Sequence, residues 1–215
     1  MTVWEWLYQR SHWWGPDGIL RRLAQHGELV GLGLAVAVGM GLAIGWVGRR
    51  SRNVGGFAQL IAVGAACTLA LQLPKLLPWQ AAIGLGVMAA VPVARATADG
   101  FAAVDPSSRA AAERLGLSGW QVLGRLELPA ARGHIVRGVR GAAVGLAGTS
   151  VLVAYAGVGG FGRYVVDGAA TGDTARQQAG IVLVVASGIV LWLLVRLVEH
   201  WVTPRSLRSR RQRHG

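Results

Sequence analysis

Charged side chains and cysteine are scarce in this sequence. Only 15% of its 215 residues are Asp, Glu, Lys or Arg, whereas soluble domains typically have about 25%. The one cysteine, Cys67, cannot form an internal disulfide and lacks the partners that a metal site requires. We therefore expect Cys67 to be a small packing residue, and we predict no metal site.

Groups of residues that carry out catalysis are also missing. The long uncharged stretches hold no paired carboxylates, and Thr149 and Ser150 have no base at a recognisable spacing. The sequence has no glycine-rich loop ending in lysine and Ser or Thr, the pattern that binds nucleotide phosphates. We predict that the chain is not an enzyme and holds no cofactor. The histidines are scattered at His12, His26, His134, His200 and His214.

Long uncharged stretches are what the sequence does contain. Each has about the 20 residues that a helix needs to cross the hydrocarbon layer. The backbone must satisfy its own hydrogen bonds in lipid, so these stretches should be helical. The chain is predicted to be an all-α integral membrane protein with five transmembrane helices. The stretches are 29–48, 53–74, 76–94, 141–162 and 177–195.

The formal net charge of +12 is unevenly distributed along the chain. Most of the basic residues lie in 49–52, in 95–140 and in 205–213, and these segments share one side of a five-span protein. The positive-inside rule then places the N-terminus outside the cell membrane and the C-terminus in the cytoplasm. Anionic lipid head groups are sufficient to explain the basic tail, so no nucleic acid is expected as a partner.

Tryptophans crowd the N-terminal segment, at Trp4, Trp6, Trp13 and Trp14. Such density is typical of the membrane interface, although an aromatic cage for a cation remains an alternative. We predict an external interfacial segment at 1–26, a five-span domain at 27–203 and a basic cytoplasmic tail at 204–215.

Residues 105–130 carry signals for two short helices joined by a tight turn. Asp105 and Pro106 suit the start of the first helix, and Gly116 suits a left-handed cap at its end. Ser118 and Gln121 have the spacing of a capping box for the second helix. That helix should stop before Pro129, because the residue preceding proline disfavours helical geometry.

This helical hairpin resembles the cytoplasmic docking loop of binding-protein-dependent ABC importer permeases, whose pattern is EAA, three residues, Gly, nine residues and Ile-x-Leu-Pro. Gly116 and the run Leu126, Glu127, Leu128, Pro129 fit that spacing. The family's glutamate is replaced here, and Glu113 lies on the same helical face as a candidate substitute. The resemblance implies that a cytoplasmic ATPase docks on Ala110, Ala111, Ala112, Glu113, Gly116, Leu126, Leu128 and Pro129.

The fourth uncharged stretch ends in a glycine-rich run, AGVGGFG at 156–162. Such a run permits a broken helix beside a transport path, or only a turn that ends the helix. It also resembles a glycine signature of the same permeases, and the path or gate candidates are Gly157, Gly159, Gly160 and Gly162. For the external Asp167 and Asp173 that follow, simple solvation is favoured over contact with a binding protein.

The resemblance implies several partners and a substrate class. An ABC ATPase dimer would bind the ATP in the cytoplasm, an extracytoplasmic protein would deliver the substrate, and a second copy or related permease would complete the membrane dimer. The runs 91–95 and 104–106 look like those of osmoprotectant permeases, which implies glycine betaine, carnitine or choline. A methionine or other amino-acid permease, a non-transporting membrane scaffold and a small channel remain alternatives.

Overall fold

The computed structural model describes residues 2–48, 53–72 and 77–202, and within them every regular element is a helix. The long helices correspond to the uncharged stretches of the sequence, and the short ones lie at the two ends of the bundle. In chain order they are α1 (Val3–Tyr8), η1 (Arg10–His12), α2 (Ile19–Val47), α3 (Val54–Gln72), α4 (Pro78–Ala102), α5 (Pro106–Arg114), α6 (Gly119–Val122), the π-helical segment η4 (Leu123–Glu127), α7 (Leu128–Ala154), α8 (Gly162–Thr171) and α9 (Thr174–Val202).

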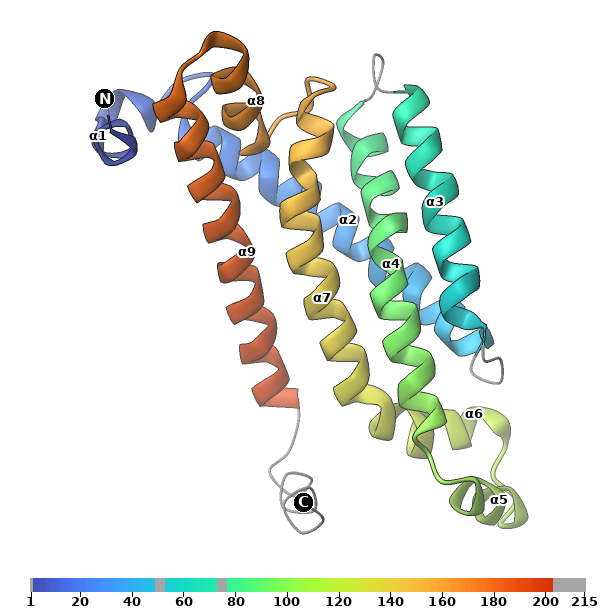
Figure 1. Ribbon diagram of the computed structural model, residues 1–215. Coiled ribbons are helices and arrows are strands. Elements are labelled where there is room, and N and C mark those ends of the chain that lie inside the picture. The colour runs from blue at the N-terminus through green and yellow to red at the C-terminus, as the bar shows by residue number, and fades with distance from the viewer. Residues whose placement is uncertain (1, 49–52, 73–76, 203–215) are drawn as a thin grey trace.

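The long helices form one bundle in which α3, α4, α7 and α9 stand side by side and α2 crosses them obliquely (Figure 1). The short helices α1 and α8 lie at one end of this bundle. The helices α5 and α6 lie at the opposite end, between α4 and α7 along the chain. The elements singled out in the sequence therefore occupy the two ends of the long helices.

Four described helical stretches are long and apolar enough to cross a membrane: Ile19–Val47, Pro78–Ala102, Gly119–Ala154 and Thr174–Trp201. The helix α3 has 19 residues and packs against α4, with Ala58 and Ala62 buried beside Val91 and Ala94. The chain is thus a multi-pass helical membrane protein.

Small residues bring α2 and α4 into close contact where the two helices cross. A β-carbon added at Gly41 would lie 2.5 Å from the Val93 side chain, and one at Gly45 would lie 2.5 Å from Thr97. Glycine at these positions therefore allows the two helices to approach closely. Gly31 and Gly39 face open space instead.

Several helix boundaries differ from those of the uncharged stretches. The helix α2 begins at Ile19, ten residues before its uncharged stretch, and includes Arg21 and Arg22. The helix α7 ends at Ala154, so the predicted fourth span of 141–162 stops short of its glycines. The basic segment 49–52, residues 73–76 and the predicted tail 204–215 lie outside the described residues.

Candidate functional sites

The helix α5 begins at a well-formed N-cap. The Asp105 carboxylate accepts a hydrogen bond from the Ser107 backbone N–H at 3.1 Å and another from the Ser107 hydroxyl. The hydrogen bonds from Ser107 lower the pKa of Asp105, so the cap is charged at neutral pH. Pro106 occupies the first turn, where a missing N–H leaves no bond unmade. The predicted helix start is confirmed.

A left-handed glycine ends α5, as predicted. Gly116 has a φ of +81°, its N–H donates to the Glu113 carbonyl, and the Leu117 N–H donates to the Ala112 carbonyl. The predicted capping box is also present, because the Ser118 side chain and the Gln121 side chain each accept a hydrogen bond from the other residue's backbone N–H. A tight turn therefore joins α5 and α6.

The predicted end of the second helix is wrong. The chain passes from α6 through the π-helical segment η4 directly into α7, and Leu128 has α-helical angles. Pro129 lies in the first turn of α7 rather than beyond a helix end. A π turn is wider than an α turn, which relieves the clash between a proline ring and the carbonyl four residues earlier.

The predicted docking residues lie along this continuous path from α5 to α7. On α5, Ala110, Ala111 and Glu113 are exposed and Ala112 is half-buried, and Leu115 after it is 80% exposed. Gly116, Leu128 and Pro129 are also exposed, whereas Leu126 is half-buried.

The sequence did not reveal the ion pair of Arg109 and Glu127, which binds this hairpin to the bundle. The Arg109 Nε atom lies 2.7 Å from the Glu127 Oε1 atom, and the Glu127 side chain is only 5% exposed. The signal in the sequence was an acidic residue in the otherwise apolar run Leu126 to Pro129. The docking pattern leaves the position of Glu127 open and therefore assigns it no role.

At the other end of the bundle, the glycine run forms a turn between α7 and α8. Gly157 and Gly160 have φ values of +82° and +104°, and Gly162 begins α8. The Gly160 N–H donates to the Gln25 side-chain oxygen of α2 at 3.2 Å. The turn thus ends α7, which is compatible with either of the two predicted roles, and it is bonded to α2.

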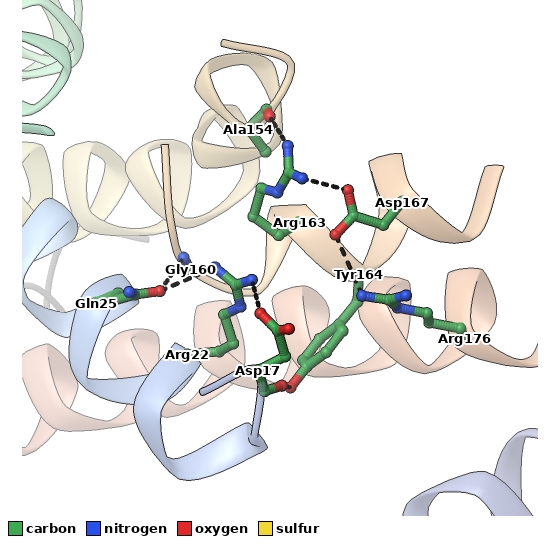
Figure 2. Close-up of polar contacts among 9 residues, drawn as sticks. All are labelled: Asp17, Arg22, Gln25, Ala154, Gly160, Arg163, Tyr164, Asp167 and Arg176. Atoms are coloured by element: carbon green, nitrogen blue, oxygen red, sulfur yellow. Dashed lines mark hydrogen bonds and ion pairs between the residues drawn. The ribbon is translucent and has the colours of Figure 1, made fainter. Parts of the chain in front are cut away.

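Charged side chains beside this turn form a network at the start of α2, α8 and α9 (Figure 2). Asp167 bridges Arg163 at 2.5 Å and Arg176 at 3.2 Å. Asp17 pairs with Arg22 at 2.6 Å, and its backbone carbonyl accepts a hydrogen bond from the Tyr164 hydroxyl. Burial raises the pKa of Tyr164 to about 12, so the hydroxyl remains a donor.

The solvation predicted for Asp167 is wrong, because two arginines hold this carboxylate, which is 20% exposed. Asp173 is exposed, and its carboxylate accepts a hydrogen bond from the Arg176 backbone N–H. Its role is therefore to cap the start of α9.

A buried histidine lies under the glycine turn. His26 Nε2 is 3.0 Å from the Ser187 hydroxyl of α9, and the imidazole packs on Phe161 at a centroid distance of 5.0 Å. Polar groups within the span region are costly unless paired, and this one links α2, α9 and the turn. Its only hydrogen bond among the described side chains is that to Ser187.

An open cavity of about 360 Å³ lies near the N-terminal segment, between η1, α8 and the start of α9. Its walls include Trp6, Trp14, Tyr164 and Arg176. Trp6 stacks on His12 and meets the Tyr164 ring edge to face, while Arg176 lies over that ring and binds Asp167. These side chains interact with one another, which favours a structural role for the aromatic segment.

Across the described residues, no group of three or more His, Cys, Asp or Glu side chains is arranged to hold a metal ion. The two candidate sites are the hairpin at one end of the bundle and the glycine turn at the other end, and α7 joins them.

The family model for the binding-protein-dependent transport system inner membrane component matches residues 30–208. The osmoprotectant import permease protein OsmW of Salmonella typhimurium is 31% identical over 202 residues, which cover 86% of this chain and 91% of that protein. The glycine betaine/carnitine/choline transport system permease protein OpuCB of Bacillus subtilis is 27% identical and covers 84% of this chain and 85% of its own.

Among solved structures, an inward-facing conformation of the MetNI methionine ABC transporter has a similar fold. The TM-score is 0.75, and the alignment covers 86% of this chain and 96% of that chain at 17% identity. At this identity the likeness concerns the arrangement of the helices.

Proposed function

The chain belongs to the family of binding-protein-dependent transport system inner membrane components, and we propose that it serves an ABC importer for a quaternary ammonium solute such as glycine betaine, carnitine or choline. The permease role itself follows from the family. The observation that carries the substrate class is the similarity to OsmW, which extends over most of both chains.

The proposal includes the orientation of the chain in the membrane. The helix α3, beside α4, crosses the membrane in addition to the four long apolar stretches and brings the number of spans to five. The hairpin of α5 and α6 faces the cytoplasm. The hairpin lies at the bundle end away from α1 (Figure 1), and arginines are frequent in its segment 95–140. An excess of arginine marks cytoplasmic segments, which supports an external N-terminus and a cytoplasmic C-terminus.

A cytoplasmic ATPase dimer binds the exposed side of α5 and supplies the ATP site that this chain lacks. Ala110, Ala111 and Glu113 are exposed there together with Leu115, and Glu113 takes the place of the family's glutamate at Ala110. A second permease copy or a related permease forms the other half of the path. An extracytoplasmic binding protein delivers the solute beside α8.

The two candidate sites then have complementary roles in alternating access. Movement of the ATPases shifts α5 and α6, and the continuous η4 and α7 carry that shift along the span to the glycine turn. Gly157, Gly159, Gly160 and Gly162 border the outer gate, where a broken helix allows close backbone approach.

Methionine is the less favoured substrate. The methionine transporter shares the fold at 17% identity, whereas OsmW is 31% identical over most of its length. A scaffold or channel is disfavoured by the match to a transport component over residues 30–208.

Uptake of radiolabelled glycine betaine by cells lacking this gene, with and without the restored gene, tests the function. Methionine uptake is measured in parallel. We expect betaine uptake to depend on the gene and methionine uptake to be unchanged. Loss of methionine uptake alone would refute the substrate class, and no change in either would refute the import role in those cells.

A further inference from the structure

The ion pair between Arg109 and Glu127 connects the docking hairpin to the inner ends of two spans. Arg109 lies on α5, and Glu127 is the last residue of η4, immediately before α7. The Nε to Oε1 distance is 2.7 Å, and a guanidinium nitrogen of Arg109 also lies 3.4 Å from the Phe101 carbonyl oxygen of α4. One side chain of α5 thus contacts α4 and the residue that immediately precedes α7.

Burial makes this pair different from an ordinary surface ion pair. The side chains of Arg109 and Glu127 are 27% and 5% exposed. Exposed pairs contribute little to stability, but removing one partner of a buried pair leaves a charge without compensation. The position of α5 relative to α7 is therefore specified by a contact that is costly to break.

The π-helical segment accounts for the position of Glu127. The Leu128 N–H donates to the Leu123 carbonyl, a span of five residues, so the turn holds one residue more than an α turn. One residue corresponds to a rotation of about 100° around the helix axis. In a continuous α-helix the Glu127 side chain would thus point well away from Arg109.

Beyond this pair, the helices at this end of the bundle are packed closely. A β-carbon on Gly100 of α4 would lie 2.8 Å from that of Ala131 in α7. Trp46 of α2 stacks on Trp120 of α6 with ring centroids 5.7 Å apart. The hairpin is thereby held against α2, α4 and α7 while the outer side of α5 stays open.

We propose that Arg109 and Glu127 are positioning residues that make α5 move as one body with the inner ends of α4 and α7, so that ATPase movement reaches the spans. The inference rests on the proposed docking of an ATPase to this hairpin. It adds that the pair transmits movement and does not itself form the ATPase contact. Breaking the pair should uncouple ATP hydrolysis from transport while the ATPase remains bound.

The first test compares Arg109→Gln and Glu127→Gln with Arg137→Gln as the matched control. Arg137→Gln removes the same charge from an exposed position on α7, away from the side of α5 to which the ATPase is proposed to bind. Each variant permease is purified with its ATPase and reconstituted with the binding protein, and glycine betaine is the added solute. The readouts are the amount of ATPase that co-purifies and the ATP hydrolysis that the solute stimulates.

We expect the Arg109 and Glu127 variants to retain the ATPase and to lose solute-stimulated hydrolysis by about tenfold or more, since each removes the ion pair that links α5 to the start of α7. The double variant with both glutamines, which can bond to each other, should lose less than the product of the two single losses. Arg137→Gln should behave as the parent.

A second measurement follows the position of α5 without any partner protein. Spin labels are attached at Ser108→Cys on α5 and Arg137→Cys on α7, both exposed, in a Cys67→Ala background. We expect one narrow distance distribution in the parent and a clearly broader one with Arg109→Gln. Arg114→Gln should leave the distribution narrow.

The outcomes separate this inference from the proposed function. If the parent complex shows no solute-stimulated hydrolysis, the proposed function fails. If the parent is stimulated and the Arg109 and Glu127 variants are stimulated equally, the coupling role is overturned. Loss of ATPase association in step with loss of hydrolysis, or an unchanged spin-label distribution, would also overturn it.

Discussion

Gly116 has a φ of +81° and open space around its α-carbon, so a substitution there tests backbone strain without a steric clash. The turn that it forms sets the angle between α5 and α6. A side chain at this angle costs roughly 1–2 kcal/mol, and asparagine tolerates it better than alanine does.

We therefore expect Gly116→Ala to destabilise the hairpin by about 1 kcal/mol and to reduce the amount of ATPase that co-purifies. Gly116→Asn should have a smaller effect. Gly119→Ala is the matched control, because Gly119 also faces open space but lies within α6 without a positive φ. Hydrogen exchange of the α5 amides measures the change, and equal protection in Gly116→Ala and Gly119→Ala would contradict the account.

At the glycine turn, the side chain of Gln25 holds the backbone in place. Its side-chain oxygen accepts hydrogen bonds from the Gly160 N–H and from Arg22. We predict that Gln25→Leu lowers the free energy of unfolding by about 1–3 kcal/mol, because the Gly160 N–H would lose its partner. Gln25→Glu keeps an acceptor and should lie near the parent. Thermal unfolding in detergent compares the variants, and equal midpoints for Gln25→Leu and the parent would refute this role.

Among the elements, the hairpin was predictable wherever short-range rules apply. The Asp105 cap, the Gly116 turn and the Ser118–Gln121 capping box each depend on residues within a few positions of one another. The continuation into α7 was not predictable, because Pro129 favours a helix end and only the packed bundle supports the π turn before it.

The charge network of α8 and α9 could also be predicted from the sequence only in part. Asp167 and Arg163 are four residues apart, a spacing that sequence reasoning can use. Arg176 reaches Asp167 only because α9 folds back against α8, and the Asp17 carbonyl reaches the Tyr164 hydroxyl across most of the chain. Such contacts depend on tertiary structure, which is why solvation was wrongly expected for Asp167.

Deletion of Gly124 tests the π turn as an element. The shortened segment should revert to an α-helix and turn Glu127 away from Arg109 by about 100°. We expect loss of solute-stimulated ATP hydrolysis from this deletion. Gly124→Ala is the control, since Gly124 has open space around it and alanine favours helix. Equal hydrolysis in the deletion and the control would show that the π turn is dispensable.

For the molecule as a whole, the positions of the two candidate sites at opposite bundle ends make the orientation testable (Figure 1). In a Cys67→Ala background, Ser118→Cys should be shielded from membrane-impermeant thiol reagents in intact cells. Ala170→Cys, on the exposed side of α8, should be labelled. Labelling at Ser118→Cys with none at Ala170→Cys would reverse the proposed topology.

The central claim is that ATP hydrolysis beside α5 drives a quaternary ammonium solute across the spans. Its most direct test is transport in proteoliposomes that contain the permease, its ATPase and its binding protein, with ATP on the ATPase side and radiolabelled glycine betaine on the other. We predict ATP-dependent movement of betaine towards the ATP side, with competition by carnitine or choline and none by methionine. Movement that continues equally with a non-hydrolysable ATP analogue, or no movement at all, would contradict the claim.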